Sequence, residues 1–163
     1  MASLTQIETL LPELRAYARS VSDTSDQADD LVQDAIERTL RAEKPPLKLD
    51  ELRPWMFRVI RNLNFDELRK KKVRQEYSQT HSRLLVDLAQ GNDHANDVLI
   101  RMTFDQLAAP HREVLFLVDV MGMKYAEAAE VMNVPQGTVM SRISRARRAL
   151  IEAMRADQKD VSQ

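Results

Sequence analysis

A helix-turn-helix pattern near the C-terminus constrains the fold more than any other stretch of this chain. Residues 126–132 carry the compact apolar face of a short helix, and Asn133 is a residue type that accepts the left-handed conformation at a helix end. Pro135 suits the first turn of a second helix, because its φ is fixed and it has no amide hydrogen to leave unpaired. The second helix is predicted from apolar residues at helical spacing, which are Val139, Ile143, Ala146 and Leu150.

The other face of this second helix has the composition of a DNA-reading surface. It carries small polar and basic side chains together with one methionine, namely Met140, Ser141, Ser144, Arg145 and Arg148. Arginines can neutralise phosphates, and small polar residues let a helix enter the major groove. An amphipathic surface helix with a solvated face is the alternative, but the spacing favours DNA binding.

The rest of the chain is also predicted to be helical. Only 3 of the 163 residues are glycine, and no segment shows the apolar–polar alternation of a strand. The sequence therefore predicts an all-α fold of two small helical domains joined by a flexible linker, with the helix-turn-helix in the C-terminal domain. The expected limits are 1–75 and 97–158 for the domains, 76–96 for the linker and 159–163 for a tail. Helices are expected at 3–21, 26–41, 54–74, 97–107 and 110–121, the first with a capping box formed by Ser3 and Gln6.

The composition also excludes several classes of function. Cysteine is absent, which rules out disulfides, thiolate zinc sites and cysteine nucleophiles and suits a cytoplasmic location. No apolar run approaches the roughly 20 residues that span a bilayer, so no membrane insertion is expected. The N-terminus lacks the features of a secretory signal. No HExxH, Gly-rich phosphate loop or nucleophile elbow is present, and no catalytic residue, cofactor or metal is predicted.

Charge is segregated along a chain whose formal net charge is only −1. The first 34 residues contain seven acidic side chains against two arginines, whereas residues 51–74 contain eight basic side chains against three acidic ones. Such segregation predicts separate partners for separate surfaces.

The acidic residues of the predicted second helix allow three interpretations. Negative charge is favourable at any helix N-terminus, and this explanation alone is sufficient. Asp26, Asp30 and Asp34 share a face, which makes them weak candidates for the metal site of an Asp-dependent enzyme. A face that binds a protein partner is the third interpretation.

Residues 42–74 suggest a second nucleic-acid contact. Pro45 and Pro46 stiffen the segment 42–53, which is either a loop shaped to hold a ligand or a plain linker. In the helix expected after it, cations and an amide are interleaved with Trp55, Phe57 and Phe65. This mixture fits single-stranded or melted DNA better than a solvated basic helix end.

Three blocks of the sequence resemble, in the same order, the bacterial sigma-70 family, and in particular its small extracytoplasmic-function (group 4) sigma factors. The blocks are ADDLVQDAIERTL, PWMFRVIRNLNFDELRKKK and YAEAAEVMNVPQGTVMSRISRARRAL. The resemblance covers nearly the whole chain. It implies a dissociable, non-catalytic specificity subunit of RNA polymerase, which binds the core enzyme, finds a promoter and helps to melt it. It also implies control by an anti-sigma factor.

The resemblance implies roles for individual residues. The surface that docks on the clamp helices of the largest polymerase subunit would be formed by Asp29, Asp30, Leu31, Gln33 and Asp34. The −10 element, with one base flipped into the loop at 43–53, would be contacted by Lys44, Lys48, Arg53, Trp55, Arg58, Arg61 and Asn62. The −35 element would be read by Thr138, Met140, Ser141, Arg142, Ser144, Arg145 and Arg148.

Two positions depart from the family pattern. Met140 stands where such proteins often carry Lys or Arg, and Ser144 is smaller than the residue of many relatives. Both differences leave the −35 sequence open. The competing function is a stand-alone helix-turn-helix regulator of transcription, but such a regulator does not need both an acidic second helix and a basic third helix.

Overall fold

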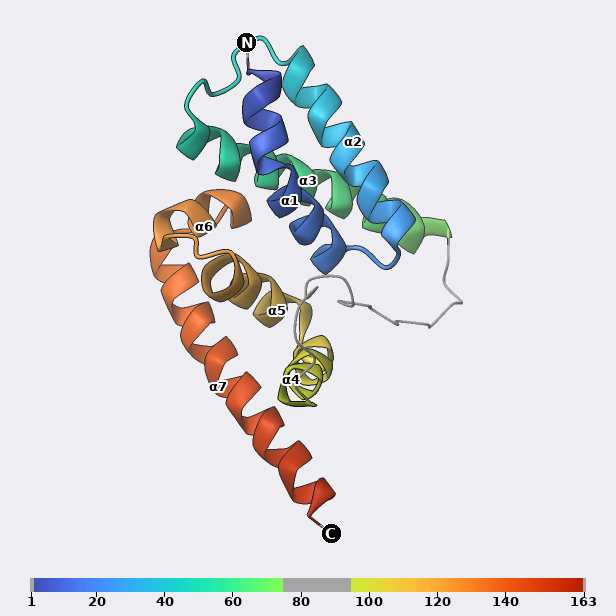
Figure 1. Cartoon of the computed structure of the whole chain (residues 1–163), viewed down its shortest axis with the longest axis vertical. Coiled ribbons are helices and arrows are strands. Elements are labelled where there is room, and N and C mark those ends of the chain that lie inside the picture. Colours follow the sequence, from blue (N-terminus) through green and yellow to red (C-terminus); the bar gives the residue numbers. More distant parts are fainter. Residues whose placement is uncertain (1, 75–94, 163) are drawn as a thin grey trace. The chain divides into compact units, whose positions relative to one another are not determined.

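The computed structural model describes residues 2–74 and 95–162, and the secondary structure within these ranges is entirely helical (Figure 1). The helices are α1 (Leu4–Val21), α2 (Ser25–Arg41), α3 (Leu49–Arg74), α4 (Ala95–Gln106), α5 (Ala109–Leu115), the π-helix η1 (Phe116–Val120), α6 (Tyr125–Met132) and α7 (Gln136–Val161). Contacts divide the chain into two compact units. One is built on α1–α3 and includes Glu130–Asn133, and the other is built on α4, α5, η1, the first part of α6 and α7. The all-α expectation is confirmed. Most of the predicted linker, 76–96, lies outside the described residues.

The N-terminal domain is a three-helix unit with an aliphatic core. Its fully buried side chains include Leu14 from α1, Ala35 from α2 and Ile60 from α3. Tyr17 and Phe57 pack edge to face inside this core, with ring centroids 4.9 Å apart. The expectation that Phe57, like Trp55 and Phe65, offers an aromatic surface to DNA is therefore wrong, because its side chain is fully buried.

The third helix begins five residues earlier than the sequence predicted. The Lys48 carbonyl accepts hydrogen bonds from the amides of Glu51 (3.2 Å) and Leu52 (2.8 Å), which starts the helix at Leu49. Leu52 is fully buried, so the first turn is held by the core, and Pro54 is tolerated inside the helix although it removes one backbone donor. The connection after α2 is consequently a short loop at 42–48, and Arg53 is helical.

The C-terminal domain contains the predicted helix-turn-helix. Asn133 has φ of 54° between α6 and α7, and Pro135 is the N-cap residue of α7. Val139, Ile143 and Ala146 are buried, as the periodicity indicated. Helix α7 extends to Val161, so it includes residues 159–161, which were predicted to lie in a tail.

The far end of α7 packs against the first helix of the same domain. Thr103 on α4 is fully buried, and its hydroxyl lies 2.8 Å from two acceptors, the Leu99 carbonyl of the same helix and Oδ2 of Asp157 on α7. Gly122, with φ of 69°, follows the C-cap residue of η1, Met121. None of the described helices has the length and apolar character needed to cross a membrane.

Candidate functional site

Helix α2 presents an exposed acidic face. Thr24 caps the helix by accepting a hydrogen bond from the amide of Gln27 at 3.2 Å, and the acidic residues follow in the next turns. Asp29, Asp30, Gln33 and Asp34 are exposed, whereas Leu31 is only 6% exposed and belongs to the core. We call the four exposed residues the acidic face. Among the residues that the structure describes, no group of three or more His, Asp or Glu side chains is placed to hold a metal ion.

A hollow of about 360 Å³ lies beside the acidic face, between α2 and α3. Asp30 and Asp34 form part of its wall, and Leu31, Leu63 and Leu68 supply apolar surface. Other lining residues are Val21, Asp23, Gln27, Asn64, Glu67 and Lys71. The α3 residues in this wall were missed by the sequence analysis, because only the packing of α2 on α3 brings the two helices together.

Helix α3 gathers four of the predicted −10 residues on one side. At 100° per residue, Trp55, Arg58, Arg61 and Asn62 fall within a sector of about 120°. Asn62 is exposed, and the other three are half-buried. The guanidinium of Arg61 lies 4.4 Å from the ring centroid of Phe65, which adds an aromatic ring to the same side. We call these five residues the α3 face.

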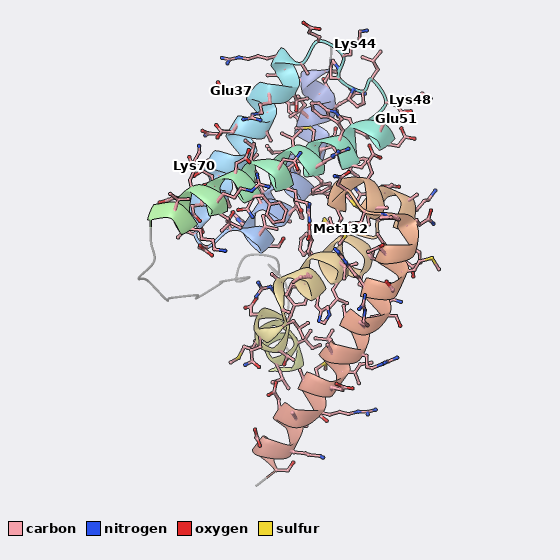
Figure 2. The ribbon with its side chains drawn as sticks, turned by 180° about the vertical axis from the view of Figure 1, so that it is seen from behind. Glu37, Lys44, Lys48, Glu51, Lys70 and Met132 are labelled. Carbon is pink, nitrogen blue, oxygen red and sulfur yellow. The ribbon has the colours of Figure 1, made fainter. Side chains whose placement is uncertain are left out.

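The remaining three predicted −10 residues are divided between two environments. Lys44 and Lys48 are exposed at the two ends of the loop at 42–48 (Figure 2). Arg53, in contrast, lies on the core side of α3, and its side chain is 22% exposed. Its Nε atom is 2.7 Å from Oε2 of Glu13 on α1. The sequence analysis placed Arg53 in a loop, and its helical position explains why it pairs with α1.

Helix α7 carries the predicted −35 residues on its outer side. Met140, Ser141, Ser144, Arg145 and Arg148 are exposed, while Thr138 and Arg142 are half-buried at the margin. The guanidinium of Arg145 turns back along the helix, and its Nε donates a hydrogen bond to the Ser141 carbonyl at 3.3 Å. Ser141 in turn donates from its hydroxyl to the Thr138 carbonyl at 3.0 Å. The first three turns of α7 therefore present small hydroxyl groups and an arginine that folds back along the helix.

Arg147 has a different role from its neighbours on α7. Its Nη2 and Nε atoms donate to the two carboxylate oxygens of Asp119 at 2.7 and 3.1 Å, and this pairing raises the pKa of Arg147 above its usual range. Asp119 lies in η1, so the pair fastens α7 to the helix before the helix-turn-helix. The sequence analysis missed this residue because its partner is 28 positions away.

Comparisons with known proteins match both domains. The family model described as "Sigma-70 region 2" matches residues 6–74, and that described as "Sigma-70, region 4" matches residues 97–150. The ECF RNA polymerase sigma factor EcfG of Rhodopseudomonas palustris is 32% identical over 148 residues, which cover 90% of this chain and 82% of that protein. The ECF RNA polymerase sigma factor SigC of Mycobacterium tuberculosis is 33% identical over 128 residues, which cover 76% of this chain and 68% of that protein.

Two solved structures are similar along most of this chain. The sigma factor RpoE of Bartonella quintana, solved with the anti-sigma factor NepR, is 28% identical with a TM-score of 0.73, and the match covers 94% of this chain and 96% of RpoE. CnrH, solved with the cytosolic domain of CnrY, is 25% identical with a TM-score of 0.64, and the match covers 94% of this chain and 87% of CnrH.

Proposed function

Because this chain belongs to the extracytoplasmic-function sigma factors of the sigma-70 family, we propose that it binds core RNA polymerase through α2 and reads a promoter with α3 and α7. The observation that carries the proposal is that one chain holds an acidic face, a face with aromatic and basic side chains, and a helix-turn-helix. A stand-alone regulator would need only the helix-turn-helix, whereas the relatives match across both domains. The chain would act in the cytoplasm with the polymerase and would have no catalytic activity of its own.

Run-off transcription tests the whole proposal. Core polymerase mixed with this protein should start transcripts at discrete sites on genomic fragments, and core polymerase alone should not. Tight binding of the purified protein to the same fragments without polymerase, combined with no transcript, would instead favour the stand-alone regulator.

The acidic face is the proposed contact with the clamp helices of the largest polymerase subunit. Three exposed carboxylates beside a partly apolar hollow suit a basic partner helix, because an arginine or lysine can lay its aliphatic stem on Leu68 and direct its charge to Asp30 or Asp34. Leu31, which the resemblance also assigns to this contact, would support it from the core.

Charge reversal on α2 tests this contact. Asp30→Lys should weaken the affinity for core polymerase by about tenfold or more, since it replaces attraction by like-charge repulsion. Glu8→Lys is the matched control, because it makes the same charge change at an exposed position on α1. Equal affinity of both variants and wild type in a core-binding titration would contradict the proposal.

The α3 face and the loop at 42–48 are proposed to hold the melted −10 strand. The rings of Trp55 and Phe65 can stack on bases that have left the duplex, and the exposed amide of Asn62 can form a hydrogen bond with the edge of a base. Lys44 and Lys48 would contact phosphates. Arg53 is better assigned to holding α3 on α1, given its short contact with Glu13.

The outer side of α7 is proposed to read the −35 duplex. Ser141 and Ser144 let the helix approach base edges, and Arg145 and Arg148 can reach guanine or phosphate. Thr138, Met140 and Arg142 would complete the contact at the margins.

Control by an anti-sigma factor is proposed from the relatives. The similar sigma factor RpoE, 28% identical to this chain, was solved with the anti-sigma factor NepR, and CnrH, 25% identical, was solved with the cytosolic domain of CnrY. A purified anti-sigma protein from the same organism should abolish run-off transcription when it is mixed with this chain before core polymerase. Inhibition that is equally strong after open-complex formation would contradict competition for the polymerase and promoter surfaces.

A further inference from the structure

The side chain of Gln6 makes two hydrogen bonds with opposite ends of its amide. Its Oε1 atom accepts from the Ser3 amide at 3.3 Å and completes the capping box that starts α1. Its Nε2 atom donates to the carbonyl of Leu47, 41 residues away, at 2.8 Å. One residue therefore caps a helix and ties the loop at 42–48 to α1.

This loop has few other restraints of its own. Within the described chain, residues 43–47 take part in no backbone–backbone hydrogen bond, and two of them are prolines, which lack an amide donor. Pro45 is buried and anchors one side of the loop. Leu47, whose carbonyl accepts the hydrogen bond from Gln6, is 64% exposed. Lys44 and Lys48 extend outward on either side (Figure 2).

Helix α1 also fixes the segment that follows the loop. Arg53 in the second turn of α3 is 2.7 Å from Glu13, which lies about two turns further along α1 than Gln6. The two contacts lie on either side of Leu49, where α3 begins. Two polar side chains of α1 thus hold the chain at Leu47 and at Arg53, on either side of the buried Leu52. The sequence analysis assigned neither of them to DNA binding.

We propose that Gln6 is a positioning residue that sets the shape of the loop at 42–48 and thereby decides which −10 base the loop accepts. The proposal rests on the proposed function, in which this loop captures a flipped base. Gln6 touches no DNA in this scheme. It acts by pre-organising the Leu47 backbone, since a site that must select one base loses selectivity when its walls can adopt several shapes.

A single substitution separates the two roles of Gln6. Gln6→Glu keeps an oxygen for the Ser3 amide, because glutamate is an equally good capping-box residue, but it has no donor for the Leu47 carbonyl. Thr5→Glu is the matched control, since it adds the same charge to the same turn of α1 at an exposed position and leaves Gln6 intact. Gln6→Ala removes both the cap and the tether.

The decisive measurement is promoter selection. Run-off transcription with core polymerase is measured on promoters that carry each of the four bases at every −10 position, at saturating protein. Gln6→Glu should reduce the ratio between the best and the other bases by about fivefold at the captured position, the factor expected for one lost hydrogen bond. Thr5→Glu should retain the wild-type ratio. A loss that is equal for all promoters would show a merely structural role and would overturn the proposal.

NMR relaxation supplies a readout that does not depend on transcription. The backbone order parameters of residues 43, 44, 47 and 48 should be lower in Gln6→Glu than in wild type, whereas those of α1 and α2 should be unchanged. Unchanged order parameters in the loop would overturn the tether even if transcription fell. A wild-type protein without any −10 preference would contradict the proposed function, whereas a wild-type preference that Gln6→Glu preserves would contradict only the role of Gln6.

Discussion

The α3 face and the outer side of α7 are both helical surfaces rich in arginine, yet their side chains suit different forms of DNA. The α3 face combines Trp55 and Phe65 with cations and an amide, and Arg61 already covers one ring. Helix α7 contains no aromatic residue, and its exposed centre is formed by two serines. Aromatic planes bind unstacked bases, while small hydroxyl residues permit entry into an intact groove. The comparison teaches that aromatic content, rather than positive charge, separates the two proposed modes of reading.

The largest effect is expected from removal of an aromatic plane. Trp55→Ala should reduce open-complex formation by roughly 5- to 150-fold, because stacking on one base is worth about 1–3 kcal/mol. Trp55→Phe should recover most of this loss by retaining a ring. Permanganate footprints of the melted strand measure the effect, and an equal loss of duplex −35 binding would break the comparison.

Arg145→Ala should change which −35 base is preferred. A bidentate contact with guanine is worth about 1–3 kcal/mol, and its loss should be confined to one position of the element. A −35 mutation series read by transcription provides the measurement. If every −35 variant weakens by the same factor, Arg145 is a phosphate anchor, and base selection must come from Met140, Ser141 and Ser144 or from DNA shape.

Arg148→Ala should weaken all promoters alike. A lost phosphate contact lowers the slope of log affinity against log salt by about one unit without a change of base preference. Binding of the −35 duplex at several salt concentrations tests this. A slope that stays at the wild-type value would place Arg148 outside the phosphate contacts.

The smallest effect is expected at the neighbouring position. Arg147→Ala removes a pair with Asp119 whose side chains are 47% and 38% exposed, and such pairs contribute only about 0.2–1 kcal/mol to stability. Urea unfolding should show this small loss, while the salt slope of DNA binding stays unchanged. A slope that falls as much as in Arg148→Ala would show that Arg147 faces DNA after all.

The sequence predicted the helices well where periodicity and caps agree locally. The capping box of Ser3 and Gln6, the left-handed Asn133 and the start of α7 directly after Pro135 all follow from residue types within a few positions. The resemblance to sigma factors was confirmed by the comparisons. The residue roles that it implied stay predictions, as do the limits of the domains.

What the sequence missed depends on contacts between distant residues. Pro54 favoured a helix start in the sequence, but burial of Leu52 outweighs that preference and extends α3 to Leu49. Phe57 is an aromatic residue of the kind that stacks on bases. Only its contact with Tyr17 shows that it belongs to the core. The hydrogen bonds of Gln6 to Leu47 and of Arg147 to Asp119 span 41 and 28 residues, and no local sequence pattern predicts them.

The contact between Thr103 and Asp157 bears on where the C-terminal domain can be cut. The segment matched by the family description stops at residue 150, but the buried Thr103 hydroxyl, 2.8 Å from the Leu99 carbonyl of its own helix, also lies 2.8 Å from Oδ2 of Asp157, seven residues beyond that limit. A fragment of residues 95–150 would keep the Leu99 acceptor but lose the contact with α7 and the last turns of that helix. We expect the shorter fragment to be less stable than a fragment of 95–162 by about 0.5–1.5 kcal/mol for the lost hydrogen bond, in addition to the lost packing. A cut at the family limit would therefore remove a part of α7 on which α4 packs.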